Sequence, residues 1–318
     1  MYRRLIIIAA AVVVVAAALL ANTILVTRQA AAATGSPLVT VDGGRLHVQE
    51  DGPADAPALV LVHGLAGSTR WWDRVVPALA RSRHVVRIDL LGHGGSDKPA
   101  DADYSIAAQG RRIGQVLDGL HIRHAVLVGH STGGYVVTAL AEQRPELVDA
   151  LALVDTGPRL DLFASEGVTG KLVEAPVAGQ LLWRVRTDGL VRRSLSSAFA
   201  PGFTAPSELV DDVRAMTYHG LLATSHASDD YLREQTMPER LSGLGMPILV
   251  IFGEQDQRWA APRSAELYRA VAGVRVEVLA DSGHSPMVEQ PARTAELLAE
   301  FAGAGNADGR PVNGRPAC

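Results

Sequence analysis

The stretch Gly129-His130-Ser131-Thr132-Gly133 places a serine between two glycines at the point where a predicted strand gives way to a predicted helix. Upstream, residues 125–128 form a short apolar run that is typical of a strand buried on both faces. Downstream, residues 135–141 have the composition of a helix. Side chains at 129 and 133 would collide at so sharp a turn, and glycine avoids the collision. The pattern therefore predicts a strained turn that leaves the Ser131 oxygen exposed at the edge of a sheet.

Strand-like and helix-like segments alternate on both sides of this turn. We expect strands over residues 58–62, 84–89, 124–128, 150–155, 247–252 and 274–279. We expect helices from about residue 71 and over residues 106–120, 132–143, 262–272 and 291–303. The runs Val39–Val41 and Arg45–Asp51 are predicted to open the domain as a β-hairpin. This alternation indicates an α/β fold, with a mostly parallel sheet covered by helices on both faces.

The alternation is interrupted once, by residues 158–240, which have helical periodicity and no convincing strand. We expect an inserted helical cap here, which divides the core into residues 38–157 and 241–302. Its many aromatic and aliphatic side chains are expected mostly to pack the cap helices together, while a minority make the cleft apolar. Residues 28–37 are predicted to be a linker, and residues 303–318, rich in Gly, Ala, Asn, Pro and Arg, a disordered tail.

The N-terminal segment Leu5–Val26 is apolar almost throughout and is long enough to cross the hydrocarbon core of a bilayer. Arg3 and Arg4 precede the segment and Arg28 follows it, so the positive-inside rule places the N-terminus in the cytoplasm and the rest of the chain outside. We expect a membrane anchor spanning residues 1–27. A signal peptide cleaved near Ala32 is the alternative, and it would release the domain from the cell.

Composition restricts the partners and cofactors. The chain has 318 residues, a formal net charge of −4 and no long basic run, which argues against binding nucleic acid. Its one cysteine is Cys318, so no internal disulfide can form. Zinc-ligand spacing, a P-loop and a Rossmann glycine pattern are all missing from the sequence, and we expect neither a metal nor a cofactor.

Four further motifs accompany the serine turn, and together with it they make the chain resemble an α/β-hydrolase from about Leu38 to Phe301. They follow one another in the order of that family. The motifs are His63-Gly64-Leu65-Ala66-Gly67, Asp89-Leu90-Leu91-Gly92-His93-Gly94-Gly95-Ser96, Gly253-Glu254-Gln255-Asp256 and Gly283-His284-Ser285-Pro286. The insertion over residues 158–240 is similar to the helical cap that many members carry between strands six and seven.

The resemblance implies a catalytic triad of Ser131, Asp256 and His284. A serine hydroxyl needs a base to take its proton and an acid to hold that base. Asp155, after strand six, is the alternative acid, since some members of the family carry the acid there. His63, His93 and His130 are the rival bases, but their positions favour backbone hydrogen bonds or the lining of the pocket.

The resemblance also implies an oxyanion hole formed by the backbone N–H groups of Leu65 and Thr132. Contacts with the substrate are expected from a set of side chains near these motifs: Trp71, Trp72, His93, Trp259 and Met287. His219 and His226 in the cap have no companion ligands in the sequence and are interpreted as structural.

The function that follows is that of an exported serine hydrolase, which cleaves an ester-like bond of a small, mainly apolar substrate through an acyl-enzyme on Ser131. Perhydrolases, C–C bond hydrolases and acyltransferases use the same triad and remain alternatives. Members with an aspartate nucleophile are disfavoured by Ser131 itself. A non-catalytic scaffold is disfavoured because no member of the expected triad is missing.

Overall fold

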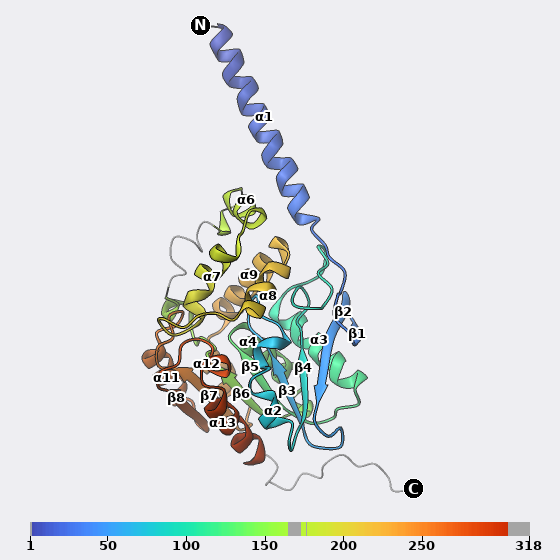
Figure 1. Ribbon diagram of the computed structural model, residues 1–318, viewed down its shortest axis with the longest axis vertical. Coiled ribbons are helices and arrows are strands. Elements are labelled where there is room, and N and C mark those ends of the chain that lie inside the picture. The colour runs from blue at the N-terminus through green and yellow to red at the C-terminus, as the bar shows by residue number, and fades with distance from the viewer. Residues whose placement is uncertain (1, 165–172, 176, 305–318) are drawn as a thin grey trace.

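The computed structural model describes residues 2–164, 173–175 and 177–304 (Figure 1). The strands are β1 (Leu38–Val41), β2 (Gly44–Asp51), β3 (Ala58–Val62), β4 (His84–Ile88), β5 (Ala125–His130), β6 (Val148–Val154), β7 (Ile248–Gly253) and β8 (Val274–Leu279). The α-helices are α1 (Tyr2–Thr27), α2 (Val76–Leu79), α3 (Ile106–Gly119), α4 (Thr132–Gln143), α6 (Ala178–Arg184), α7 (Asp188–Leu195), α8 (Ser207–Ala215), α9 (Tyr218–Glu234), α10 (Met237–Ser242), α11 (Ala261–Arg269), α12 (Pro286–Glu289) and α13 (Pro291–Ala304). Short 3-10 helices cover Thr69–Trp72, Pro145–Leu147, Leu160–Leu162 and Ser196–Ala198.

The strands form one mostly parallel sheet in the order β1-β2-β4-β3-β5-β6-β7-β8, as the alternation predicts. The antiparallel pairs of this sheet are the two that β2 forms, with β1 in the opening hairpin and with β4 on its other side. In the central register Val62 of β3 lies opposite Gly129 of β5, and His130 of β5 lies opposite Val154 of β6. The loops that follow these three strands therefore leave the sheet at the same edge.

The core lies on both faces of this sheet. Alternate residues of β3 point to opposite sides, so that Val60 and Val62 join one buried cluster while Leu59 and Leu61 join the other. The first cluster includes residues of α3, α4 and α11, and the second includes residues of α2 and α13. Helices on both faces agree with the prediction from sequence.

The helix predicted to begin near residue 71 is wrong in form. Thr69–Trp72 is a 3-10 turn in which the Ser68 hydroxyl accepts a bond from the Arg70 N–H, and α2 that follows is only four residues long. The other core helices lie close to their predicted ranges, and α4 matches its range of 132–143. The predicted tail covers residues 303–318, and its residues from 305 onward lie outside the described part of the chain.

Helices α6 to α10 lie in the chain between β6 and β7, where the insertion was expected. The described part of the 158–240 segment has helices and no strand of the sheet, although residues 165–172 and 176 lie outside the description. Figure 1 shows α6, α7, α8 and α9 gathered at one end of the body, the end from which α1 projects. The described helices of this segment thus lie at the end of the body that carries the N-terminal helix.

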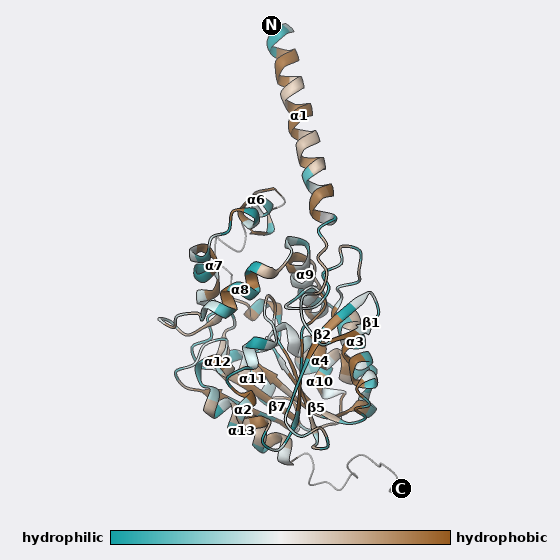
Figure 2. Cartoon of the chain, turned by 45° about the vertical axis from the view of Figure 1, so that its right-hand side comes forward, coloured by the Kyte–Doolittle hydropathy of each residue, from teal (hydrophilic) through white to brown (hydrophobic). Residues whose placement is uncertain are grey.

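Helix α1 is the one helix of the described chain that is long and apolar enough to cross a membrane, over Tyr2–Val26 with a mean hydropathy of 2.8. Figure 2 shows it as a largely hydrophobic rod standing clear of the body. The segment after it is held by hydrogen bonds. Ala31 and Lys98 exchange backbone bonds of 3.0 and 2.7 Å, and the Gln29 side chain accepts a bond of 3.2 Å from the Tyr218 N–H of α9. The predicted linker is thus fastened to the body.

One buried carboxylate, Asp212 of α8, connects the cap to the core. It accepts a 2.6 Å hydrogen bond from the Ser68 hydroxyl and lies 3.3 Å from the Arg70 guanidinium. Ser68 caps the 3-10 helix Thr69–Trp72 that follows β3, and Arg70 lies within that helix. Burial raises the pKa of Asp212 to about 6, although Ser68 and Arg70 favour its charged form.

We expect this contact to depend on pH. The folded chain holds the Asp212 proton up to about pH 6, whereas an ordinary aspartate with a pKa of 3.8 has lost it, so the folded state binds more protons between these values. The stabilisation of the folded chain by the proton on Asp212 is full below pH 4 and declines as the pH rises to 6. Relative to Asp212→Asn, the free energy of unfolding should fall by up to about 3 kcal/mol over this range.

Denaturant unfolding of the full chain in detergent, measured at several pH values, tests this expectation. The control is Glu208→Gln, which removes an exposed carboxylate from the same helix and should leave the pH curve parallel to that of the wild type. Parallel pH curves for the wild type and Asp212→Asn would contradict it.

Candidate active site

Ser131 stands at the junction of β5 and α4 with a φ of 50° and a ψ of −119°. A serine rarely adopts this backbone conformation, and holding it costs about 1–3 kcal/mol. The surroundings fix it, since the Ser131 N–H donates to Val154 O at 2.9 Å and Gly134 N–H donates back to Ser131 O at 2.9 Å. The sharp turn predicted from the sequence is therefore present.

Three glycines allow the backbone to pack closely around this turn. A Cβ atom on Gly129 would overlap the carbonyl of Gly133, and one on Gly133 would overlap the carbonyl of Val62. A Cβ atom on Gly64 would lie 3.0 Å from the Cβ of Ser131. The loop after β3 and the turn after β5 thus touch at the serine, which is the reason for glycine at these positions.

His63 holds the loop that carries Leu65. Its Nε2 accepts a 3.1 Å bond from Leu90 N–H, so its proton lies on Nδ1, which donates to Gly64 O at 2.7 Å. Burial keeps the pKa of His63 below its ordinary value, against the attraction of Asp89. His63 is therefore a neutral structural residue, and it fixes the backbone one residue before Leu65.

Asp89 connects this loop to the loop after β4. The carboxylate is buried and accepts bonds from Thr69 N–H at 2.6 Å and Gly95 N–H at 2.7 Å. His47 Nδ1 lies 2.7 Å from the same carboxylate. Burial raises the pKa of Asp89, but these bonds outweigh it and bring the pKa below the usual value. The Asp89 motif thus supports the site without reaching the cleft.

Asp256 and His284 form a buried pair. Asp256 Oδ2 lies 2.8 Å from His284 Nδ1, and both side chains are fully shielded from solvent. The other carboxylate oxygen accepts bonds from Arg258 N–H at 2.7 Å and Trp259 N–H at 3.2 Å. Burial raises the pKa of Asp256, but the charge and hydrogen bond of His284 and the two N–H groups bring it below its usual value. The carboxylate is charged and orients the imidazole.

The other nitrogen of His284, Nε2, is buried and has no hydrogen-bond partner among the described residues. An unpaired buried nitrogen is unusual and often has a chemical role. The residue before the serine fastens this histidine, because His130 Nε2 donates to His284 O at 2.7 Å. Glu289 fastens the loop on the other side by accepting bonds from Gly283 N–H at 3.0 Å and Ser285 N–H at 3.1 Å.

Asp155, the alternative acid, lies next to this pair. It follows β6 with a φ of 44°, and its Oδ1 accepts a 2.9 Å bond from Gly253 N–H. Its Oδ2 has no partner among the described residues. Burial, and then the charge of Asp256, raises the pKa of Asp155 well above its usual value. The pKa of Asp155 therefore lies above that of Asp256, so Asp256 is the first of the two to lose its proton.

Ligand atoms of Asp155, Asp256 and His284 lie within 4.8 Å of one another, so the three could in principle hold a cation. Asp256 and His284, however, are already bonded to each other at 2.8 Å. A metal ion would have to break that bond, and we assign no metal to the group.

Two cavities lie near the serine and share lining residues. A small one of 60 Å³ is lined by Ser131, Thr132 and Leu65, together with Trp259 and Phe163. An adjoining cavity of 340 Å³ extends beneath the cap and is lined by Trp71 and other residues. Leu65 and Arg258 line both cavities. The predicted oxyanion residues and two of the expected substrate contacts, Trp71 and Trp259, thus belong to one cleft.

The other three expected substrate contacts, Trp72, His93 and Met287, line neither cavity. Each is completely buried. Trp72 and Met287 pack in the cluster on one face of the sheet, and His93 stands against His63 with ring centroids 5.2 Å apart. Their proximity to the motifs in the sequence does not bring them to the cleft, because each side chain points into the core.

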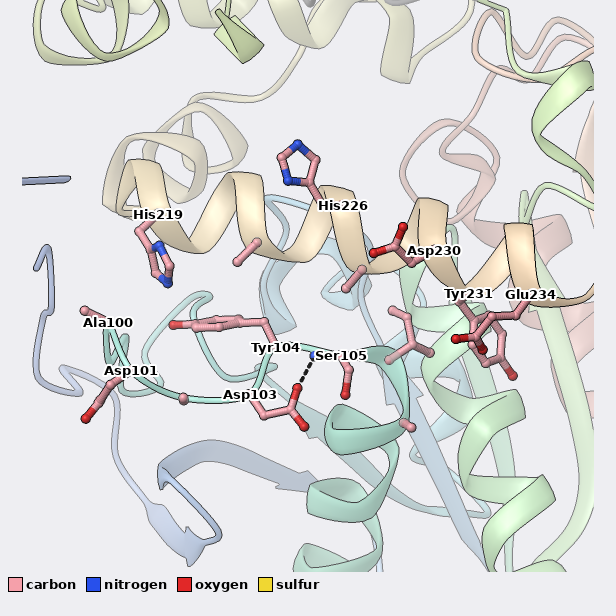
Figure 3. A pocket seen from close by; sticks show the side chains of 15 residues that line it. Ala100, Asp101, Asp103, Tyr104, Ser105, His219, His226, Asp230, Tyr231 and Glu234 are labelled. Carbon is pink, nitrogen blue, oxygen red and sulfur yellow. Dashed lines mark hydrogen bonds between the residues drawn. The ribbon is translucent and has the colours of Figure 1, made fainter. Parts of the chain in front are cut away.

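A groove of 540 Å³ between α9 and residues 100–107 is larger than either cavity. Figure 3 shows His219 on the groove side of α9, near Tyr104, and His226 of the same helix also lines the groove. The hydroxyl of Ser105 accepts a 3.2 Å bond from Ala108 N–H at the start of α3. None of the predicted catalytic residues lines this groove.

Sequence reasoning gave no role to Glu289 and Arg258. Glu289 lies five residues after His284, and an acidic side chain one short turn after the histidine is a weak signal that could have indicated it. Arg258 lies two residues after Asp256, and only the fold shows that it borders both cavities.

The chain is similar to several known proteins. A provisionally named 2-succinyl-6-hydroxy-2,4-cyclohexadiene-1-carboxylate synthase of Bacillus subtilis is 29% identical, with 84% of this chain and 98% of that protein covered. A monoacylglycerol lipase of Xenopus laevis is 27% identical, with 78% of this chain and 76% of that protein covered.

Among solved structures, a membrane phospholipase A described as a bacterial virulence factor is similar, with a TM-score of 0.67 and 25% identity. The match covers 96% of this chain and all of that one. A family model described as alpha/beta hydrolase fold matches residues 57–291, which is most of the chain. The resemblance found in the sequence is thereby confirmed, and the chain belongs to the alpha/beta hydrolase fold family.

Proposed function

We propose that this hydrolase cleaves carboxylic esters through a covalent acyl-enzyme on Ser131, with His284 as the base and Asp256 as the acid that orients it. The buried and unpaired Nε2 of His284 is the observation that carries the proposal. Its partner nitrogen is bonded to a charged carboxylate, and its backbone is tied to the residue before the serine. That leaves one nitrogen free to accept the serine proton.

In the proposed reaction, Ser131 Oγ attacks the ester carbonyl while its proton passes to His284 Nε2. The N–H groups of Leu65 and Thr132 stabilise the negative oxygen that forms; Thr132 begins α4, where the first N–H groups lack an intrahelical acceptor. His284 then protonates the departing alcohol. A water molecule, deprotonated by the same nitrogen, releases the acid and restores the serine.

Asp256 remains charged throughout these steps and stabilises the imidazolium. Asp155 is proposed to act as a neutral neighbour. Charged carboxylates on Asp155 and Asp256, whose oxygen atoms lie within 4.8 Å of each other, would repel each other. Only Asp256 has the two additional backbone donors that stabilise a charge.

The mainly apolar substrate is proposed from the cleft itself. The larger cavity is bordered by the aromatic rings of Trp71 and Trp183 and by Leu195, Val213 and Leu221. Side chains of this kind receive the acyl chain or an apolar alcohol. A lipase among the relatives is consistent with such a substrate.

We also propose that α1 is an uncleaved anchor and that the catalytic domain lies outside the cytoplasm. Val26, at the end of the helix, is buried against the body. Cleavage near Ala32 would cut the segment that is bonded to Lys98. The two arginines before the helix support the orientation.

Turnover of p-nitrophenyl esters and labelling by a fluorophosphonate probe test the chemistry. The wild type should hydrolyse the esters and bind the probe, and Ser131→Ala should do neither, because only Ser131 lies at the turn that His130 ties to His284. The control is Ser105→Ala, in the larger groove of Figure 3, which should keep both activities. Equal labelling of the wild type and Ser131→Ala would remove Ser131 from the mechanism.

Alkaline carbonate extraction and protease digestion of intact cells test the anchor. Full-length protein should stay in the membrane pellet, since the apolar span is retained, and external protease should degrade residues after 28. Soluble protein cut near Ala32 would support a signal peptide instead. Protection from external protease would reverse the orientation.

A further inference from the structure

The 340 Å³ cavity, which shares Leu65 and Arg258 with the small cavity at Ser131, combines an apolar wall with an unusual set of charges. Among the described residues, Arg193 and Arg258 are its only charged lining residues, and Ser194, Ser196 and Ser197 also line it. The cavity has no acidic lining residue among those described. A cavity lined by cations alone attracts anions, although the chain as a whole has a formal net charge of −4.

Arg258 is the more informative of the two. It is half-buried, it lines both cavities, and its backbone N–H is fixed by Asp256. Its Nε donates a long 3.4 Å bond to the Ser197 hydroxyl. No carboxylate of the described residues lies within 4.0 Å of its guanidinium, or of that of the exposed Arg193.

Other arginines near the cap have acidic partners. Arg70 pairs with Asp212, and Arg214 pairs with Asp188. The one carboxylate that lines the small cavity, Asp229, lies 3.2 Å from Arg233 on the next turn of α9. Asp229 therefore already has a cation beside it, while Arg258 has none among the described residues.

Arg258 also lies near the nucleophile, because it lines the small cavity together with Ser131. An anionic group held by Arg258 would therefore lie close enough to influence the position of the bond that is cleaved.

We propose that the cleft binds an anionic group, a carboxylate or a phosphate, of an ester that also carries an apolar chain. Arg258, assisted by Arg193 and Ser197, holds the anion, and the ring of Trp71 and its apolar neighbours hold the chain. A guanidinium forms strong, often bidentate hydrogen bonds with either anion. The inference rests on the proposed ester hydrolysis, and it refines the expectation of a purely apolar substrate.

The test compares esters in pairs that differ in one charge. The carboxylate pair is the mono-p-nitrophenyl ester of octanedioic acid and its neutral methyl ester. The phosphate pair is 1-decanoylglycerol 3-phosphate and 1-decanoylglycerol. The measured quantity is the ratio of kcat/KM for the anionic member to kcat/KM for the neutral member, in the wild type and in each variant.

We expect the wild type to prefer the anionic member of at least one pair, and the pair preferred identifies the anion. Arg258→Gln should lower that ratio tenfold or more, which corresponds to about 1.4 kcal/mol. Arg193→Gln should lower it by a smaller factor, because this side chain is exposed. The matched control is Arg184→Gln, which removes an exposed charge from α6 that lines neither cavity, and its ratio should be unchanged.

A ratio that Arg258→Gln leaves unchanged, or that Arg184→Gln lowers equally, would overturn the inference. Binding separates this outcome from failure of the proposed function. Calorimetry with octyl phosphate and octanedioic acid monomethyl ester, on Ser131→Ala protein, needs no turnover. Binding that is lost in Ser131→Ala/Arg258→Gln supports the anion site even if no ester is cleaved, and binding that is independent of Arg258 contradicts it.

Discussion

The 2.8 Å bond between Asp256 and His284 is the interaction on which the site depends. Two backbone N–H groups keep the carboxylate charged, and the carboxylate keeps a proton on Nδ1 of the histidine. The opposite nitrogen is buried and has no hydrogen-bond partner among the described residues. Asp155 lies beside the pair, and burial and the charge of Asp256 raise its pKa well above the usual value.

The bond between Asp256 and His284 can serve the proposed reaction only because the backbone joins the turn of Ser131 to the loop of His284, through the bond from His130 to His284 O. The positive φ of Ser131 needs support from the neighbouring strand β6 and from the close approach of Gly64, Gly129 and Gly133. His130 joins the serine turn to the histidine loop through its bond to His284 O. Glu289 holds the other side of that loop by accepting a bond from Gly283 N–H. Strain at one residue is thus held by hydrogen bonds from several segments.

Much of the fold could be predicted from local pattern. The glycines around Ser131 and the apolar runs of the strands are local signals, and helix α4 and strand β8 coincide with their predicted ranges. The motif order and the resemblance also indicated the residues that the structure brings together at the carboxyl edge of the sheet.

What the sequence could not indicate depends on contacts between distant segments. Trp72, His93 and Met287 lie beside motifs but point into the core, which depends on packing across the sheet. Glu289 matters because Gly283 and Ser285 turn toward it, and Arg258 matters because the cap encloses a cavity there. The choice between Asp256 and Asp155 depends on backbone donors that only the folded loop provides.

The most direct measurement of the central claim is the protonation of His284, by NMR of protein labelled with ¹⁵N-histidine and recorded at alkaline pH. A proton on Nδ1 with a bare Nε2 is predicted, and its strongly downfield signal should vanish in Asp256→Ala and persist in Asp155→Asn. A proton on Nε2, or a signal that is lost in Asp155→Asn and retained in Asp256→Ala, would contradict the account.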